Sequence, residues 1–523
     1  MNHPSFHSLR LLLLACPLLW LSCGPSPQAQ GPTADLTHRQ GDLGDGTYLN
    51  PLLGGDYPDP TILRDGDDFY MTHSCFDYLP GLVVFHSTDL VNWEPVSYGL
   101  QTYLGSIWAP DLTKYGDRYY IYFTVAHPDG RKNFVVWADT PYGPWSDPID
   151  LKVGNIDPCH AVGEDGSRWL FLSGGRRIRL TDDGLATVPG TLETVYPGWA
   201  YPEEWETEGL CLEGPKVKRI GEYFYYLNAE GGTAGPPTSH MVVVARSRSI
   251  DGPWEDSPYN PLIHTYSASE RWWSKGHGSL VDTPDGRWYI VYHAYENGFT
   301  GLGRQTLMEP VTLTDDGWFR PVLPGRGIEA PIAKPIASER RADRRERLGE
   351  WRIGLDWKFY KAYDPERCRV EDGVLIMKAQ GDTPHESSPL MCVAGLHAYE
   401  VEVEVDIDPG ATAGLLLYYN AAFYVGEGFN VERRLRYRKG AANGGERMGG
   451  VTHLWLRLRN RDQVVTGSYS LDGVNWTREG WGMEVSGYNH NTLYDFQSML
   501  PGVFASGRGE VRFSHFKFTT LDN

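Results

Sequence analysis

Short apolar stretches separated by polar turns recur throughout the first three hundred residues. One pattern occurs five times: a polar turn, then aromatic residues, then an apolar run typical of a buried strand. Successive occurrences lie 50 to 64 residues apart, which leaves room for four short strands in each unit. The pattern predicts an all-β fold with a five-bladed β-propeller over residues 46–335. The aligned positions are Tyr70, Tyr120, Leu170, Tyr225 and Tyr289.

The last third of the chain shows a different strand pattern. Residues 399–405 alternate between apolar and polar, as in a half-buried strand, whereas 414–419 are almost wholly apolar. An Asp-Gly pair at 472–473 lies between strand-like runs and predicts a hairpin turn. We therefore expect a β-sandwich over residues 351–523, joined to the propeller by a charged linker at 336–350.

Composition favours an all-β protein that acts on a neutral partner. The 523 residues include 60 glycines and 36 prolines, and 13% are aromatic, which favours strands and turns over long helices. The formal net charge of −19 disfavours nucleic acids and anionic membrane surfaces, because phosphate-rich surfaces attract basic proteins. Neutral sugars fit better, and the 18 Trp and 31 Tyr include rings that could stack on them. Most of these aromatic residues are nevertheless expected simply to pack the strands.

The first 45 residues resemble an export signal followed by a tether. A basic start precedes an apolar run that is too short to cross a bilayer permanently, which is typical of a signal peptide over residues 1–22. The small residue before Cys23 resembles a bacterial lipobox, in which Cys23 is lipidated, although Trp20 stands where leucine is usual. Residues 23–45 have the composition of a flexible tether. We expect an exported lipoprotein of a bacterial cell envelope, either periplasmic or on the cell surface, with simple secretion as the alternative.

The five cysteines beyond Cys23 show no CxxC spacing. This argues against both a zinc site and a disulfide scaffold. Cys368 and Cys392 could pair in an oxidising compartment, and buried free thiols are the alternative.

A second repeated feature places acidic residues near the centre of the predicted propeller. Nine to thirteen residues before each aligned position lies a short motif with a polar or acidic residue. In a propeller this is the start of the innermost strand, which borders the central channel. Asp59, Asp157 and Glu213 are therefore expected to converge, and buried carboxylates are costly unless they have a function. For any single motif, the alternative is that an Asp-Pro pair merely starts a turn.

Three carboxyl groups at one channel suit the cleavage of a glycosidic bond. One carboxylic acid protonates the leaving oxygen, and one carboxylate acts on the anomeric carbon, through a water molecule in the inverting variant. A third carboxylate near the acid would raise its pKa by like-charge repulsion and keep it protonated near neutral pH. Glu230 precedes a double-glycine turn and is expected to lie on the far side of its strand from Glu213, without a catalytic role.

Five motifs follow one another along the predicted propeller. They are Tyr57-Pro58-Asp59-Pro60, Ser106-Ile107-Trp108-Ala109-Pro110-Asp111, Asn155-Ile156-Asp157-Pro158, Leu212-Glu213-Gly214-Pro215 and Gly303-Arg304-Gln305-Thr306. Together they resemble the motifs of glycoside hydrolase family 43. The resemblance implies that Asp59 is the general base that activates water, that Asp157 orients the acid and modulates its pKa, and that Glu213 is the general acid.

The same resemblance implies the rest of the pocket. Arg304 would reach the substrate or the base, and Trp108 and Phe76 would form apolar walls. His277 corresponds to a histidine beneath the site that sometimes binds a calcium ion or water, so it is a candidate both for the substrate site and as a metal ligand. A hydrogen-bonded core histidine is the alternative. Any Ca²⁺ in the channel would be structural or electrostatic, and no organic cofactor is expected.

The predicted sandwich, of jelly-roll or concanavalin-A-like type, resembles the domain that follows the propeller in exo-acting members of this family, where it may lend a loop to the pocket. The resemblance implies an inverting, exo-acting hydrolase that releases terminal α-L-arabinofuranose or β-D-xylose from plant polysaccharides or oligosaccharides. The alternatives are an endo-acting arabinanase or xylanase and a surface glycan-binding propeller without catalysis. The sandwich could also be a carbohydrate-binding module. Because all three acidic positions are intact, the enzyme is favoured.

Overall fold

The computed structural model describes residues 40–323, 325–341 and 347–521. The predicted signal peptide, the predicted lipidation site Cys23 and most of the predicted tether lie outside these ranges. Within them, no helix combines the length and apolar character needed to span a bilayer. The helices are single turns: η1 (Thr300–Leu302), η2 (Gly327–Glu329), η4 (Pro365–Arg367) and α1 (His490–Leu493).

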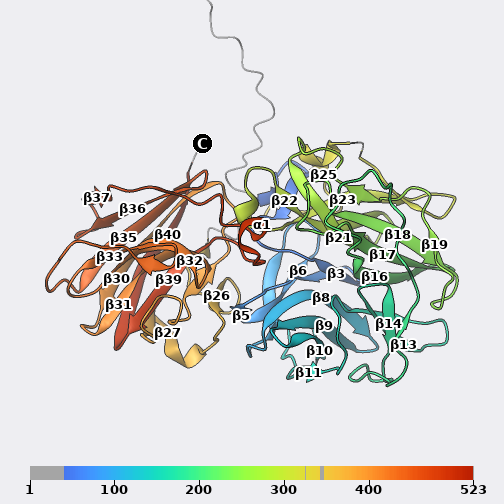
Figure 1. Cartoon of the computed structure of the whole chain (residues 1–523), viewed down its shortest axis with the longest axis horizontal. Helices are drawn as coiled ribbons and strands as arrows, with labels where there is room; N and C mark the ends of the chain where they lie inside the picture. Colours follow the sequence, from blue (N-terminus) through green and yellow to red (C-terminus); the bar gives the residue numbers. More distant parts are fainter. Residues whose placement is uncertain (1–39, 324, 342–346, 522–523) are drawn as a thin grey trace, which may run out of the picture. The chain divides into compact units, whose positions relative to one another are not determined.

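Four antiparallel sheets of propeller-blade size occupy residues 61–264 (Figure 1). In each sheet the strands pair in sequence order, except that β20 pairs with β18 instead of β19. The first sheet holds β3 (Thr61–Asp65), β4 (Asp68–Thr72), β6 (Gly81–Ser87) and β7 (Glu94–Leu100), and the second β8 (Ser106–Tyr115), β9 (Arg118–His127), β10 (Gly130–Ala138) and β11 (Ile149–Asp150). The third holds β12 (Cys159–Val162), β13 (Arg168–Leu172), β14 (Arg176–Arg179) and β15 (Glu193–Thr194), and the fourth β16 (Glu213–Ile220), β17 (Tyr223–Glu230), β18 (Met241–Ser247), β19 (Glu255–Asp256) and β20 (Ile263–His264).

A further sheet of seven strands joins the two ends of this region. Its strand β2 pairs with β23 at Leu53 and Thr306, so the N-terminal strands complete a sheet whose other members come more than two hundred residues later. The last of the five predicted units therefore shares its sheet with strands from the start of the chain. The strands are β1 (Gln40–Asp42), β2 (Thr47–Leu53), β21 (Trp272–Asp282), β22 (Trp288–Glu296), β23 (Gln305–Leu313), β24 (Phe319–Pro321) and β25 (Ile332–Ala333).

The arrangement of these sheets is propeller-like, as predicted. One strand of each sheet, the first strand of the four smaller sheets and β21 of the seven-stranded sheet, contacts the next in the closed order β3, β8, β12, β16, β21 and back to β3. The five aligned positions of the repeat all fall on the strand that follows the ring strand of their sheet, and all five are buried. Aromatic and apolar residues recur there because both faces of that strand pack against neighbouring sheets.

Two sheets of eight strands form the C-terminal sandwich around a core of aliphatic and aromatic side chains. The predicted alternation at 399–405 is confirmed, since β30 alternates between buried and half-buried residues there. One sheet holds β26 (Trp357–Tyr360), β29 (Leu390–Cys392), β31 (Ala411–Asn420), β32 (Phe423–Phe429), β33 (Arg434–Arg438), β34 (Ala441–Ala442), β39 (Leu500–Gly507) and β5 (Tyr78–Leu79). The other holds β27 (Cys368–Glu371), β28 (Val374–Lys378), β30 (Ala398–Ile407), β35 (His453–Arg461), β36 (Val464–Ser470), β37 (Trp476–Arg478), β38 (Met483–Glu484) and β40 (Glu510–Thr520).

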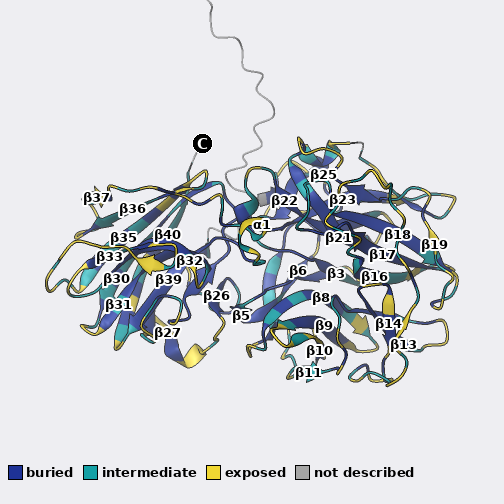
Figure 2. Ribbon diagram, in the orientation of Figure 1, coloured by how far each residue is buried: buried dark blue, intermediate teal, exposed yellow. Residues whose placement is uncertain are grey.

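A strand from the propeller region completes one sheet of the sandwich. β5 pairs with β26, with Leu79 opposite Phe359 and Tyr78 opposite Tyr360. The rings of Tyr78 and Tyr360 meet edge-on at 5.7 Å inside a shared hydrophobic cluster, and the strands here are coloured as buried in Figure 2. The pairing of β5 with β26 holds residues of the sandwich close to the propeller.

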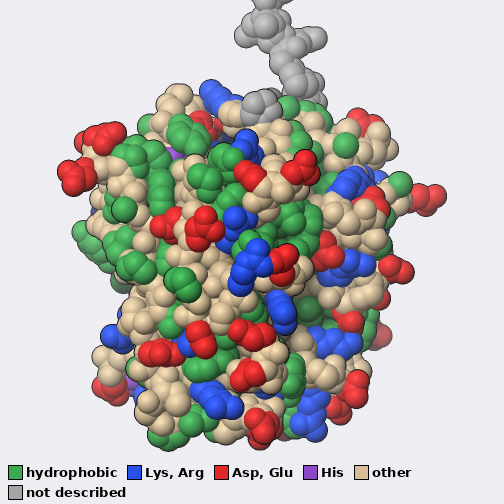
Figure 3. All heavy atoms as spheres, turned by 90° about the vertical axis from the view of Figure 1, so that its right-hand side faces the viewer, with side chains coloured by type: hydrophobic (Ala, Val, Ile, Leu, Met, Phe, Trp, Pro, Cys, Tyr) green, Lys and Arg blue, Asp and Glu red, His purple; other side chains and the backbone are tan. Residues whose placement is uncertain are grey.

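The described cysteines and the surface agree with the expectations for thiols and charge. Cys368 is a free thiol, and the Sγ of Cys392 donates to the carbonyl of Pro501 at 3.6 Å, so the predicted alternative of buried thiols is confirmed. The face drawn in Figure 3 carries acidic and basic side chains interspersed, without a field of one sign. That face therefore offers no basic footprint for nucleic acid.

Candidate active site

Each propeller sheet has a residue in the left-handed backbone region, either just before or within the strand that belongs to the closed ring. The φ angles of these residues lie between 34° and 59°, and four of the five precede a proline. A non-glycine residue is strained in this region, and such strain is concentrated at functional sites. The equivalent residues are Asp59, Ala109, Asp157, Gly214 and His277.

Glu213 does not occupy the repeat position that the sequence analysis gave it. The equivalent of Asp59 and Asp157 in the fourth sheet is Gly214, and Glu213 precedes it by one residue. Glycine is suited to this point, because a Cβ at 214 would meet the ring of His277 at 3.0 Å. Glu213 therefore lies one residue before the repeat position that the two aspartates occupy.

Asp59 is buried, and both of its carboxylate oxygens are engaged. Nη1 of Arg304 lies 2.9 Å from Oδ1, and Oγ of Ser74 donates to Oδ2 at 2.5 Å. Burial alone would raise the pKa of Asp59, but the charge of Arg304 and the neighbouring His277 and His293 hold that pKa well below its usual range. Asp59 is therefore an ionised carboxylate with a fixed orientation.

Asp157 is buried and accepts two hydrogen bonds on one oxygen. Oγ of Ser173 donates to Oδ2 at 3.1 Å, and the backbone N–H of Gly214 donates to the same atom at 3.0 Å. The N–H of Asp157 itself donates to Oγ1 of Thr124 at 3.0 Å. Burial, and after it the charge of Asp59, raise the pKa of Asp157 to about 6.

Glu213 is half-buried at the start of β16. Burial, followed by the charges of Asp157 and Asp59, raises the pKa of Glu213 well above its usual range. Glu213 is therefore protonated at a pH where Asp59 is ionised. Carboxyl groups whose environments push their pKa values apart are suited to act as a base and an acid in one reaction.

A residue of the sandwich, Phe496, completes the aromatic wall beside these groups. Its ring stacks on Phe76 with centroids 6.2 Å apart and an interplanar angle of 12°, and it meets Trp108 edge-on at 5.8 Å. The guanidinium of Arg304 lies 4.8 Å from the centre of the Phe496 ring. The structure thus brings the predicted residues Phe76, Trp108 and Arg304 together around a phenylalanine that the sequence analysis did not single out.

A cavity of about 190 Å³ lies next to this wall, between the propeller and α1. Trp273 and Tyr295 line it from the propeller, and His490 and Asn491 line it from the sandwich. The ring of His490 stacks on Phe496 with centroids 3.7 Å apart. Because Phe496 also contacts Arg304, the ring of Phe496 lies between the cavity and the acidic pocket. The cavity combines aromatic rings that can stack on a sugar with imidazole and amide groups that can form hydrogen bonds.

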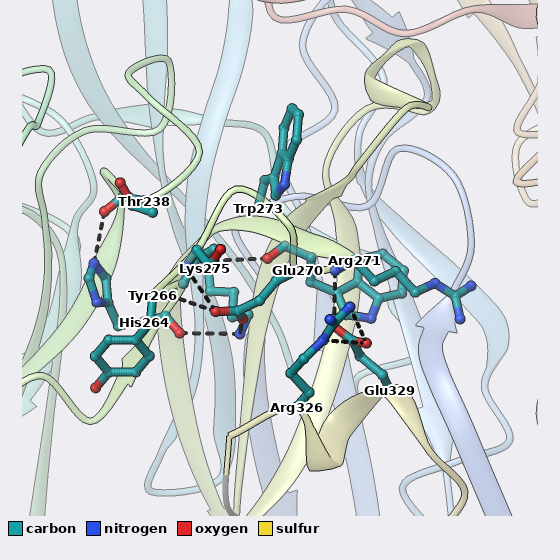
Figure 4. Close-up of polar contacts among 12 residues, drawn as sticks. Thr238, His264, Tyr266, Glu270, Arg271, Trp273, Lys275, Arg326 and Glu329 are labelled. Atoms are coloured by element: carbon teal, nitrogen blue, oxygen red, sulfur yellow. Dashed lines mark hydrogen bonds and ion pairs between the residues drawn. The ribbon is translucent and has the colours of Figure 1, made fainter.

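A buried ion pair holds the segment that carries Trp273. Nζ of Lys275 lies 2.7 Å from Oε2 of Glu270, and Oε1 of Glu270 accepts the N–H of Tyr266 at 2.7 Å (Figure 4). The indole N–H of Trp273 donates to the carbonyl of Ala268 at 3.1 Å. These bonds fix the edge of the cavity on the propeller side.

His277 lies next to Asp59, together with a second histidine that the sequence analysis did not identify. Nδ1 of His277 is 3.3 Å and Nδ1 of His293 is 3.0 Å from Oδ1 of Asp59. Burial lowers the pKa of His277 to about 4 and that of His293 to about 3, so both rings are neutral near pH 7. His277 is therefore a buried, neutral histidine close to the carboxylate of Asp59.

The same three residues are the candidate metal group among the described residues. Their ligand atoms, one carboxylate oxygen and two imidazole nitrogens, lie within 4.8 Å of one another. Calcium takes six to eight oxygen ligands, and the carboxylate of Asp59 is already paired with Arg304. Asp59, His277 and His293 therefore do not fit a calcium site.

Two serines hold the aspartates in the same way, and the sequence analysis missed both. Ser74 follows Asp59 by 15 residues and Ser173 follows Asp157 by 16, and each donates to its aspartate from the end of a second strand. Aligning the ends of the second strands would have revealed this repeated serine.

Glu230 is buried and has a structural contact. Its Oε1 accepts the N–H of Trp199 at 2.7 Å, and Oε2 is buried without a hydrogen-bond partner among the described residues. Burial raises the pKa of Glu230 to about 8. Glu230 is therefore a protonated acid near neutral pH that anchors the segment leading into β16.

Both halves of the chain match known protein families. Residues 48–319 match the family described as Glycosyl hydrolases family 43. Residues 350–520 match the family described as Beta xylosidase C-terminal Concanavalin A-like domain. The two matches cover the propeller-like region and the sandwich.

Individual relatives are similar at moderate identity. The chain is 33% identical to a "Non-reducing end alpha-L-arabinofuranosidase BoGH43B" of Bacteroides ovatus, over 60% of this chain and 61% of that protein. It is 28% identical to a "Xylan 1,3-beta-xylosidase" of Vibrio sp, over 83% of this chain and 90% of that protein. The crystal structure of "the GH43 BlXynB protein from Bacillus licheniformis" superposes with a TM-score of 0.81 at 27% identity, covering 91% of this chain and all of that one.

Proposed function

Because the chain belongs to glycosyl hydrolases family 43, we propose that it is an inverting, exo-acting glycosidase that releases terminal α-L-arabinofuranose or β-D-xylose from plant polysaccharides or oligosaccharides. The observation that carries the proposal is the opposed protonation of Asp59 and Glu213. An ionised carboxylate and a protonated carboxylic acid at one pocket are what this hydrolysis requires.

We assign the three carboxyl groups separate tasks. A water molecule attacks the anomeric carbon and gives a proton to Asp59, while the bond from that carbon to the leaving oxygen breaks and Glu213 gives its proton to that oxygen. The charge of Asp157 keeps Glu213 protonated until then. Exchange with solvent restores the proton on Glu213 and removes it from Asp59.

Exo action is supported by the position of Phe496. An endo-acting enzyme needs an open groove in which a polymer passes the catalytic groups on both sides. Here a ring of the sandwich packs against Arg304 and Phe76 on one side of the pocket. We infer that the pocket admits one terminal sugar and that the cavity at Trp273 and His490 receives the unit to which it is attached.

The choice between arabinose and xylose stays open within this proposal. Relatives with each printed activity are similar to the chain. Both sugars are neutral pentoses, which suits a pocket walled by aromatic rings and one arginine.

Two further features belong to this proposal. We infer that the seven-stranded sheet serves as the fifth blade of the propeller, which the closed ring of first-strand contacts supports. We also propose that the protein is exported and lipid-anchored through Cys23 in the bacterial cell envelope, on the strength of the N-terminal sequence.

The test is the identity and stereochemistry of the first product. The protein is incubated with arabinoxylan and with arabino- and xylo-oligosaccharides, and the products are followed by chromatography and proton NMR during the first minutes. A single pentose of inverted anomeric configuration is expected. Oligosaccharides as the first products would support the endo-acting alternative, and binding without release would support a glycan-binding protein.

A further inference from the structure

The outer face of the sandwich carries a trough lined by arginines. Its residues are distant in sequence from the carboxyl groups of the acidic pocket. Its volume is about 730 Å³, and it lies on β35, β36 and β37 (Figure 1). On β35 the leucines at 454, 456 and 458 are buried, which turns the intervening side chains outward. The residues that define this arginine trough are Arg457, Arg459, Arg461, Thr466, Ser468 and Arg478.

The arginines stand on both sides of a strand that carries hydroxyl groups. Arg459 lies opposite Thr466 across the β35–β36 pair, and Arg457 lies opposite Ser468. Ser468 in turn lies opposite Arg478 across the β36–β37 pair. Since neighbouring strands are about 4.8 Å apart, the hydroxyls of β36 form a floor flanked by guanidinium groups on either side.

Two of the arginines are held in place and two are not neutralised. Nη2 of Arg457 is 2.6 Å from Oε2 of Glu402, and Nη2 of Arg459 is 2.7 Å from Oε2 of Glu400. Arg461 and Arg478 are exposed, and neither forms an ion pair with any residue in the described part of the chain. The trough lining has four arginines and the two acids Glu400 and Asp462, and Glu402 adds a third acid through its ion pair with Arg457. The trough therefore keeps a net positive charge on a protein whose formal net charge is −19.

An aromatic ring lies beside the trough lining, against Arg457. Trp476 precedes Arg478 by two residues on β37, so both side chains point to the same side of the sheet. The guanidinium of Arg457 lies 3.6 Å from the centre of the Trp476 ring, and Trp476 is half-buried. A fixed aromatic ring beside hydroxyls and guanidinium groups offers stacking to a sugar ring and paired hydrogen bonds to a carboxylate.

We propose that the arginine trough binds a glycan chain bearing carboxylate groups, that is, a polysaccharide with uronic acid units. Arg461 and Arg478 would bind the carboxylates, Thr466 and Ser468 would contact sugar hydroxyls, and Trp476 would stack on one ring. The choice of a glycan over other polyanions rests on the proposed function, whereas the need for an anion rests on the charges of the trough. Binding here would hold the enzyme on an acidic polymer while the separate pocket removes terminal sugars.

The test is the affinity of the full chain for defined oligosaccharides, measured by calorimetry at low salt. The probes are a tetragalacturonate, a glucuronate-substituted xylo-oligosaccharide and a neutral arabinoxylan oligosaccharide of similar length. The double variant Arg461→Gln/Arg478→Gln is compared with the wild type and with Arg512→Gln, an arginine on the same sheet outside the trough lining. The aryl-glycoside rate of each protein is measured in parallel, so that loss of folding or of catalysis is seen separately.

The double variant is expected to bind at least one uronate probe at least tenfold more weakly than the wild type, with unchanged aryl-glycoside hydrolysis and with Arg512→Gln unaffected. Which uronate probe binds identifies the polymer. The proposal is overturned if the wild type binds neither uronate, if the neutral probe binds equally well, or if the double variant loses less than threefold. Binding of anionic lipid vesicles or of nucleic acid in place of both uronates would overturn it as well.

Discussion

The backbone N–H of Gly214 donates a hydrogen bond of 3.0 Å to Oδ2 of Asp157. This bond ties the start of the strand that carries the proposed acid to the carboxylate proposed to modulate it. Because Glu213 directly precedes Gly214, the charge on Asp157 is held close to the Glu213 carboxyl group. The like charge then raises the pKa of Glu213, after the larger effect of burial.

As the pH rises, an Asp157→Asn variant should therefore lose activity at a lower pH than the wild type does. Removing the like charge lowers the pKa of Glu213, so the alkaline limb of the kcat/KM profile should move down by about 1 pH unit. Asparagine keeps an acceptor oxygen for the Gly214 N–H, so the strand geometry is retained. An alkaline limb that stays in place or moves up would contradict the role of Asp157.

The Phe496→Ala variant should retain the fold and lose catalytic efficiency. Without the ring, Arg304 and Phe76 lose a packing partner, and the terminal sugar is less well positioned. We expect kcat/KM to fall by about tenfold or more. Tyr494→Ala, in the same segment and 89% exposed, is the matched control and should behave as the wild type. Equal catalytic efficiency of the two variants would contradict a role of Phe496 in the pocket wall.

Glu230 should make stability depend on pH. Its pKa is raised by burial to about 8 in the folded protein but is about 4.3 in an unfolded chain. Between these values the folded state holds a proton that the unfolded state lacks, so the contribution is complete below about pH 4 and is lost as the pH rises through 8. Relative to Glu230→Gln, the melting temperature of the wild type should fall between pH 5 and 8 and level off above 9. Parallel pH curves for the two proteins would contradict the shifted pKa.

The N-terminal interpretation predicts that Cys23 attaches the protein to a membrane. Full-length wild type expressed in a bacterium should sediment with membranes and dissolve in detergent, whereas Cys23→Ala should be recovered without detergent. Cys16→Ala, within the predicted signal peptide, is the control and should behave as the wild type. Sedimentation of Cys23→Ala with membranes would contradict lipidation at this residue.

The repeat in the sequence was sufficient to predict much of the site. A residue's position within a repeat determines how close it lies to the centre of a propeller, so Asp59 and Asp157 could be placed from spacing alone. Glu213 was found with an offset of one residue, because the left-handed position of its sheet is taken by Gly214. Ser74 and Ser173 follow the two aspartates at nearly the same spacing, and this repeated spacing could have identified them from the sequence.

Phe496 and His293 could not be predicted in the same way. Phe496 reaches the pocket because the sandwich packs against the propeller through β5 and β26, and no local pattern encodes that packing. His293 lies inside β22 among buried residues, where a histidine is indistinguishable from the core until its neighbour Asp59 is known. The share of the N-terminal strands in the last sheet could not be predicted for a similar reason, since pairing of Leu53 with Thr306 joins distant segments.

The central claim is that Asp59 and Glu213 act as base and acid of a pentose-releasing glycosidase. The most direct measurement compares wild type, Asp59→Asn and Glu213→Gln on p-nitrophenyl α-L-arabinofuranoside, p-nitrophenyl β-D-xyloside and the matching natural oligosaccharides. We predict that the wild type releases one of the two pentoses. Asp59→Asn should be slower on every substrate, by about 10²- to 10⁴-fold. Glu213→Gln should lose a similar factor on the oligosaccharide and much less on the aryl glycoside, whose leaving group needs little protonation. Release by Asp59→Asn at the wild-type rate, or an equal loss by Glu213→Gln on both kinds of substrate, would contradict the account.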